Sequence, residues 1–122
     1  VCGGMMLVEG GKNVAHGDGK RHPRTCVGLK PKQVLLLVVV DGRHPDHSEG
    51  MTHEELADTL ISLGAVEGME LDGGGSATFV VADPTPTVLN VAMSAPVPAG
   101  IQIPPPGLLR ANGFNLAVYA KK

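Results

Sequence analysis

Apolar residues along the chain fall into short runs of strand length, separated by glycine, proline and charged residues. The longest run occupies residues 34–40, where seven apolar residues follow one another between turn-forming residues. A run of this kind is typical of a strand covered on both faces, so we expect 34–40 to be the central strand of a sheet. Further strands are expected at residues 5–8, 25–29, 65–71, 78–82 and 114–120. After a turn at Gly10–Gly11, either a second strand or a loop is expected around Val14.

One segment instead repeats its apolar residues at helical spacing. Thr52 and Glu55 form the pattern of a capping box, and Gly64 supplies a left-handed C-terminal cap, so a helix is predicted at about 53–63. Its apolar stripe consists of Leu56, Ala57, Leu60, Ile61 and Leu63. We expect this stripe to pack across the strand at 34–40.

The segment from 83 to 107 is rich in proline, which predicts a long, partly extended connection with at most one edge strand. With 122 residues the chain is long enough for one hydrophobic core and too short for two. The elements together predict a single α+β domain over residues 1–122. We expect a mixed β-sheet, one main amphipathic helix at about 53–63 packed on it, and a proline-rich C-terminal connection.

Composition and charge limit the possible partners. Ten basic and twelve acidic side chains leave a formal charge of −2, and no stripe of Lys and Arg interleaves with aromatic residues, so nucleic acid is not expected as a partner. The run at 34–40 is far shorter than the ~20 apolar residues of a membrane-spanning helix, so no membrane segment is expected. Cys2 and Cys26 could form a disulfide, which the sequence alone does not decide, although Cys26 on a strand is more typical of a small buried hydrophobic residue.

Three consecutive glycines, Gly73, Gly74 and Gly75, lie between Asp72 and Ser76. Glycine loses more backbone freedom on folding than any other residue, so a triple glycine indicates a place where the backbone must stay bare. Successive amides of such a loop can form a nest for an anion, with the Asp72 carboxylate and the Ser76 hydroxyl at its two ends. A glycine-rich hairpin turn is the structural alternative.

A second group of polar residues, Asp41-Gly42-Arg43, directly follows the run at 34–40. If the two strands are neighbours in one sheet, the Arg43 fork, the carboxylates of Asp41 and Asp72 and the glycine amides converge on one pocket that suits a phosphate. Asp-Gly-Arg alone is common in turns, so only its pairing with the glycine loop favours a site.

Several known kinds of site do not match the sequence. The glycine loop lacks the Gly-Lys-Ser/Thr ending of a P-loop and precedes β-prone residues, and there is no Gly-x-Ser-x-Gly nucleophile elbow. His44, Asp46 and His47 offer metal-binding atoms, but their spacing is not that of a known metal site, and a solvated loop is the favoured interpretation. We therefore expect no metal and no cofactor.

A set of short motifs follows in order along the chain: Arg24-Thr25-Cys26-Val27-Gly28, Asp41-Gly42-Arg43, Ser48-Glu49-Gly50-Met51-Thr52 with Glu55-Leu56-Ala57, Leu63-Gly64-Ala65, Leu71-Asp72-Gly73-Gly74-Gly75-Ser76, and Arg110 with Asn115-Leu116-Ala117-Val118-Tyr119. In this order and spacing, the motifs resemble those of the phosphodiester glycosidase family. The resemblance spans nearly the whole chain. It implies that the chain is a C-terminal part of the full family domain, and it favours an extracytoplasmic location, whether secreted, periplasmic or lumenal.

The resemblance implies a hydrolase that cleaves a sugar-1-phosphodiester, such as an N-acetylglucosamine-1-phospho-glycan, into free sugar and a phosphomonoester. This reaction needs stabilisation of the departing phosphate and a carboxylate at the oxocarbenium-like sugar carbon. On this interpretation the catalytic carboxylate is Asp72, with Asp41 as the second choice. The phosphate- and substrate-binding residues are Arg24, Thr25, Arg43, Ser48, Glu49, Gly73, Gly74, Gly75 and Ser76.

Two alternatives stay open. The chain could be a non-catalytic module that binds a glycan or a sugar phosphate, or a structural, self-assembling derivative of the family. A solvent-facing loop position explains Glu49 nearly as well as a binding role does, and the capping role alone explains Glu55. Exposed strand edges and the thin cover expected for 34–40 also predict a homo-oligomer, or an upstream segment that completes the domain.

Overall fold

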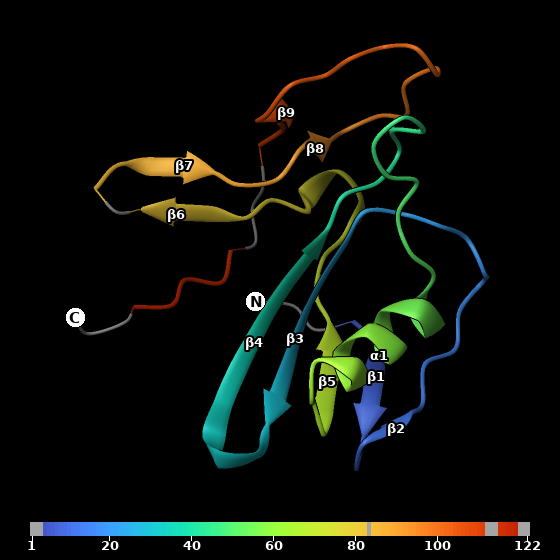
Figure 1. Ribbon diagram of the computed structural model, residues 1–122, viewed down its shortest axis with the longest axis vertical. Coiled ribbons are helices and arrows are strands. Elements are labelled where there is room, and N and C mark those ends of the chain that lie inside the picture. Colours follow the sequence, from blue (N-terminus) through green and yellow to red (C-terminus); the bar gives the residue numbers. More distant parts are fainter. Residues whose placement is uncertain (1–3, 83, 112–114, 120–122) are drawn as a thin grey trace.

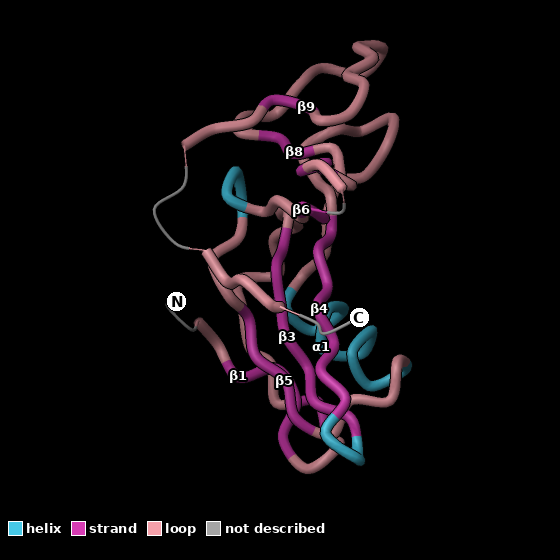
Figure 2. Tube along the Cα trace, turned by 90° about the vertical axis from the view of Figure 1, so that its left-hand side faces the viewer, coloured by secondary structure: helices cyan, strands magenta, loops and turns pink. Residues whose placement is uncertain are grey.

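The computed structural model describes residues 4–82, 84–111 and 115–119 of the 122-residue chain. Its main body is a five-stranded antiparallel sheet with one helix on one face (Figure 1, Figure 2). The elements are β1 (Met6–Glu9), β2 (Lys12–Asn13), β3 (Arg24–Lys30), β4 (Val34–Val40), α1 (His53–Ser62) and β5 (Glu67–Glu70). Their order across the sheet is β2-β1-β5-β3-β4, and this arrangement confirms the α+β class. Among the described residues, no helix is long and apolar enough to cross a membrane.

The later part of the chain forms two small strand pairs beyond the end of the sheet at which β4 finishes (Figure 1). β6 (Val80–Ala82) pairs antiparallel with β7 (Pro86–Val88), and β8 (Ala92–Met93) pairs in parallel with β9 (Gly107–Leu108). The prediction that 78–82 belongs to the main sheet is therefore wrong, because its strand pairs with the segment that follows it. The proline-rich connection also holds three short strands and not at most one.

The apolar run at 34–40 forms β4, but β4 lies at the edge of the sheet and not at its centre. Every second side chain from Leu36 to Val40 packs against the core, and the alternate ones point to the opposite face. Val34 and Leu35 are 47% and 44% exposed. The prediction of a central strand is therefore wrong. Both faces of β4 are apolar, as in a covered strand, but α1, the α-helix of the described residues, covers only one face of the sheet.

α1 packs over β1 and β2 and over glycines of β3 and β5. Leu60 is fully buried against Gly28 of β3 and Gly68 of β5, where an added Cβ would come within 3.1 and 2.7 Å of its methyl groups. The expectation that the helix crosses 34–40 is wrong for this reason. The two glycines leave room for the helix at the middle of the sheet, and β4 reaches the core only from its margin.

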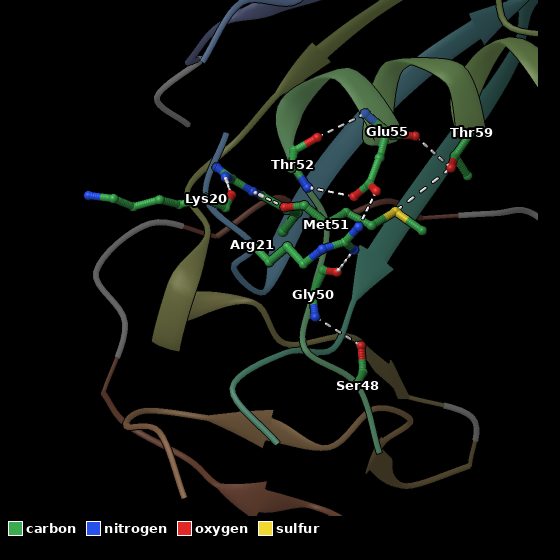
Figure 3. A network of polar contacts seen from close by, with 9 residues as sticks. Lys20, Arg21, Ser48, Gly50, Met51, Thr52, Glu55 and Thr59 are labelled. Carbon is green, nitrogen blue, oxygen red and sulfur yellow. Dashed lines mark hydrogen bonds and ion pairs between the residues drawn. The ribbon is translucent and has the colours of Figure 1, made fainter. Parts of the chain in front are cut away.

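The predicted caps of α1 are confirmed. The Thr52 hydroxyl accepts from the Glu55 amide at 3.2 Å, and the Glu55 carboxylate accepts from the Thr52 amide at 3.0 Å (Figure 3). Gly64 has the expected positive φ, at +92°. The Glu55 carboxylate also pairs with Arg21, which donates to the Gly50 carbonyl at 3.1 Å. The segment before β3 is thereby attached to the start of the helix.

Two further local predictions are confirmed. Gly10 and Gly11 form the turn between β1 and β2, with φ angles of +57° and +75°. Cys26 is fully buried in the core, and this burial, with a smaller effect of Glu70, raises the pKa of its thiol to about 12. Among the described residues Cys26 is a free thiol, and Cys2 lies outside them.

The closing strand expected at 114–120 is not formed over the part that the structure describes. Residues 115–119 belong to no strand and are exposed, and positions 114 and 120 lie outside the described residues. The alternating pattern was read as a strand, but a strand also needs a neighbour for its backbone groups. None of the described strands pairs with 115–119.

Replacing Gly68 by alanine is expected to destabilise the fold, because the new methyl group would lie 2.7 Å from Leu60 Cδ1. Overpacking of this kind lowers the free energy of unfolding by about 1–3 kcal/mol, which urea denaturation measures. Gly4→Ala is the matched control, since a Cβ there meets its nearest atom at an ordinary 3.4 Å. In a Leu60→Ala background the effect of Gly68→Ala should largely disappear. An unchanged effect would show that α1 does not rest on Gly68.

Candidate functional site

The glycine loop, residues 72–77, leaves β5 and folds against the start of β3. The Gly74 amide donates to the Pro23 carbonyl at 2.8 Å. The Ala77 amide donates to the Gly74 carbonyl at 3.2 Å, which closes a single 3-10 turn over Gly74–Ser76. Part of the hydrogen-bonding capacity of the loop is therefore used inside the protein.

Gly73 and Gly75 have no side chain because the backbone of other segments lies directly against them. A Cβ on Gly73 would lie 3.0 Å from the Pro23 carbonyl oxygen, and a Cβ on Gly75 would lie 2.9 Å from the Cα of Ser94. A neighbouring backbone cannot move aside as the end of a flexible side chain can. The bare backbone inferred from the sequence is thus required by close packing on both sides of the loop.

Arg43 extends over the remaining glycine, Gly74. Its Nη2 lies 3.0 Å from the position of a Cβ on Gly74, whose φ is +59°. Its Nη1 donates to the carbonyls of Met93 and Ser94 at 3.3 and 3.2 Å. Arg43 itself has a φ of +62°, a costly conformation for a residue with a side chain and one that concentrates at functional sites. The structure thus brings Arg43 to the glycine loop across β3, which separates β4 from β5.

A second guanidinium reaches the loop from the C-terminal segment. Arg110 Nη2 donates to Ser76 Oγ at 2.8 Å, and its Nε lies 3.2 Å from the position of a Cβ on Gly75. Arg110 is not among the site residues expected from the sequence. Arg110 is 34 positions from Ser76 and follows a run of prolines, so no local pattern marks it, and its place within the family-like motifs was the only signal.

The two candidate carboxylates have different surroundings. Asp41 accepts from the Val91 amide at 3.0 Å, from Asn90 Nδ2 at 2.9 Å and from His47 Nε2 at 2.8 Å. Its side chain is only 15% exposed. Asp72 is exposed and has no hydrogen bond or ion pair with the described residues. Asp41 thus holds the 90–91 segment in place, whereas Asp72 at the mouth of the glycine loop is available to a ligand.

Arg24 is buried, and protein acceptors already engage its guanidinium. Its Nη1 forms an ion pair with Glu70 Oε1 at 2.8 Å, and its Nε donates to the Met51 carbonyl at 3.0 Å. Glu70 Oε2 lies 2.9 Å from His53 Nε2, which is also 2.7 Å from Arg24 Nη1. Both partners of the ion pair are less than a tenth exposed. This buried network joins β3, β5 and the first residue of α1 directly below Gly73, whose added Cβ would lie 3.7 Å from Glu70 Oε1.

The remaining predicted residues have no hydrogen bond to the glycine loop among the described residues. Thr25 Oγ1 is buried without a hydrogen-bond partner in this part of the chain. Ser48 Oγ donates to the Asp41 carbonyl at 2.6 Å and so shapes the turn after β4. Glu49 is exposed. Within the described residues no three His, Cys, Asp or Glu side chains gather in a way that could hold a metal ion.

Comparison with known proteins gives the following relatives. A model of the family described as phosphodiester glycosidase matches residues 1–104. The N-acetylglucosamine-1-phosphodiester alpha-N-acetylglucosaminidases of Bos taurus and Homo sapiens are 43% and 40% identical over 58 residues, which is 48% of this chain and 11% of theirs. The SPbeta prophage-derived uncharacterized protein YomE of Bacillus subtilis (strain 168) is 34% identical over 61 residues, or 50% of this chain and 9% of that protein.

A solved structure also resembles this chain. It is the crystal structure of a hypothetical protein from Synechocystis, with a TM-score of 0.52 and 27% identity. The match covers 62% of this chain and 15% of that one. The chain therefore spans about a tenth of the length of the curated relatives it matches, and less than a fifth of the solved structure.

Removing the charge of Arg24 should strongly destabilise the fold, because Glu70 would be left as a buried carboxylate without its cation. Breaking one side of a buried pair typically costs about 3–5 kcal/mol, so Arg24→Leu should lower the free energy of unfolding by that amount. The double variant Arg24→Leu, Glu70→Leu should recover much of the loss. Arg21→Ala, which breaks a half-exposed pair with Glu55, is the control and should cost about 1 kcal/mol or less. A loss for Arg24→Leu as small as that of Arg21→Ala would contradict the buried network.

Proposed function

Because this chain belongs to the phosphodiester glycosidase family, we propose that it hydrolyses a sugar-1-phosphodiester to the free sugar and a phosphomonoester. N-acetylglucosamine is the proposed sugar, since the bovine and human relatives are named for that substrate. The observation that carries the proposal is the uncompensated Arg43 guanidinium on a bare glycine loop, with the exposed Asp72 carboxylate at the mouth of that loop.

The chemistry of the reaction fits this arrangement. The leaving group is a phosphate that is already a stable anion, because its second pKa is about 6. Departure therefore needs a fixed positive charge more than a strong acid, and Arg43 supplies that charge from a position held by two backbone carbonyls. A charge held in place before the reaction does not have to reorganise as the bond breaks.

The sugar carbon needs a carboxylate on its other side. In an oxocarbenium-like transition state a carboxylate acts either as the nucleophile or as the base for water. Asp72 is proposed for this role, since no described residue occupies its oxygens. We propose that Asp41 positions neighbouring groups and does not itself react. Its carboxylate accepts hydrogen bonds from the Val91 amide and from Asn90, and Asp41 precedes Arg43 by two residues.

We also propose a role for the loop that precedes α1. Ser48 fixes the turn that begins at Asp41, and Glu49 extends into solvent beside it. We propose that Glu49 forms hydrogen bonds with hydroxyl groups of the sugar or of the acceptor alcohol. We propose that Arg24 does not bind phosphate, because protein acceptors already surround its guanidinium. Its proposed role is to hold Glu70, which lies next to Gly73.

Replacing Asp72 by asparagine is expected to keep the fold and the affinity for phosphate while lowering turnover by orders of magnitude, since an amide neither attacks nor accepts a proton. Arg43→Ala should instead weaken binding first, by about tenfold to a hundredfold, because it removes a charge-assisted hydrogen bond. Both are measured with a chromogenic sugar-1-phosphodiester and by phosphate titration. Asp18→Asn, an exposed aspartate outside the site, is the matched control.

The outcome separates the alternatives. A wild-type chain that binds the ligand without turnover would favour a non-catalytic sugar-phosphate or glycan-binding module. A wild-type chain that neither binds nor turns over would favour a structural role, for which the supporting observation is the open apolar edge at β4. Equal turnover by Asp72→Asn and wild type would remove Asp72 from the reaction.

A further inference from the structure

We propose that Arg110 and Arg43 together form a two-arginine anion site over Gly74–Gly75, and that this site prefers a doubly charged phosphomonoester to a singly charged phosphodiester. Arg110 lies beyond residues 1–104, the part of the chain that the family model matches. The choice of ligand rests on the proposed function, since the phosphomonoester is the product of that reaction. The site itself rests on the positions of the two side chains.

The two guanidiniums reach the same short stretch of backbone from different segments. Arg43 comes from the loop after β4 and its Nη2 lies over Gly74, while Arg110 comes from the segment after β9 and its Nε lies over Gly75. Neither Nη2 of Arg43 nor Nε of Arg110 donates a hydrogen bond to a described residue. Unused donors of two cations therefore gather at adjacent glycines.

No described carboxylate forms an ion pair with either of these two side chains. The ion pairs among the described residues involve Lys20, Arg21, Arg24, His47 and His53, and neither Arg43 nor Arg110 takes part in one. Two like charges held near adjacent glycines repel each other, so an anion bound by both would stabilise their positions. The glycine loop contributes less than a full nest, because the Gly74 and Ser76 amides already donate to backbone carbonyls. The arginines are therefore the main anion ligands.

Two arginines distinguish ligands by charge. A phosphomonoester carries a charge of about −1.5 to −2 at pH 7, whereas a phosphodiester carries a single charge. Each guanidinium can form a bidentate pair with phosphate oxygens, and a monoester offers one more unsubstituted oxygen than a diester. The pair of arginines should therefore hold the product more tightly than the substrate, and the product should inhibit the reaction.

The test uses methyl phosphate and dimethyl phosphate as probes, titrated into the full chain and followed by calorimetry at pH 7.5. Wild type is expected to bind methyl phosphate more tightly than dimethyl phosphate. Arg110→Ala should weaken methyl phosphate binding by about tenfold to a hundredfold and reduce the preference between the two probes. Arg110→Gln keeps a group that can bond to Ser76 and removes the charge, so it should lose affinity to a similar extent. Arg110→Lys should retain part of it.

Lys12→Ala is the matched control, because it removes one exposed positive charge on β2, outside the glycine loop. It should leave both affinities within about twofold of wild type, well below the loss expected for one charge-assisted contact. Thermal unfolding of each variant checks that the fold is kept, and Arg110→Lys serves if Arg110→Ala and Arg110→Gln do not fold.

The result also separates this inference from the proposed function. Wild-type affinity for methyl phosphate in Arg110→Ala and Arg110→Gln would overturn the two-arginine site even if the chain hydrolyses its substrate. No binding of methyl phosphate by wild type would overturn it as well. If the chain binds methyl phosphate in a way that depends on Arg110 but shows no turnover, the two-arginine site is supported and the proposed hydrolase activity is rejected.

Discussion

The candidate site depends on one constraint, the contact between the bare backbone of Gly73–Gly75 and the segments that surround it. On one side the loop rests on Pro23 and on the start of β3, and on the other it touches the backbone of Ser94. A side chain on Gly73 or Gly75 would separate the segments. The contact sets the distance between β3, the loop after β4 and the C-terminal segment, and so determines where Arg43 and Arg110 can place their charges.

The buried network below the loop makes this contact rigid. Arg24, Glu70 and His53 belong to β3, β5 and α1, and their hydrogen bonds join the three elements within a short distance of Gly73. A buried ion pair adds little net stability, but it is specific about which groups meet. The exposed Asp72 and the arginines therefore lie on a support whose own polar groups are largely paired. Arg24 therefore belongs to the support of the loop, whereas Arg43 faces the loop.

Several of the features predicted correctly from the sequence are local ones. The capping box of Thr52 and Glu55, the turn at Gly10–Gly11 and the cap at Gly64 each depend on residues a few positions apart. The place of β4 could not be predicted in this way, because an apolar run looks the same whether a second layer covers it or its far face stays open. Leu60 was recognised as a core residue, but its partners Gly28 and Gly68 are 32 and 8 positions away and carry no apolar signal. Arg110 was not chosen as a site residue for the same reason, since its contact with Ser76 spans 34 positions.

In the proposed reaction water or a carboxylate attacks the sugar carbon while the arginines hold the departing phosphate, and oxygen isotope labelling distinguishes this from attack at phosphorus. A sugar-1-phosphodiester is hydrolysed by the chain in water labelled with heavy oxygen, and the phosphomonoester is examined by mass spectrometry. We expect a phosphomonoester without heavy oxygen, because the bond between the sugar carbon and oxygen is the one that breaks. Heavy oxygen in the phosphomonoester would mean attack at phosphorus and would contradict the proposed reaction.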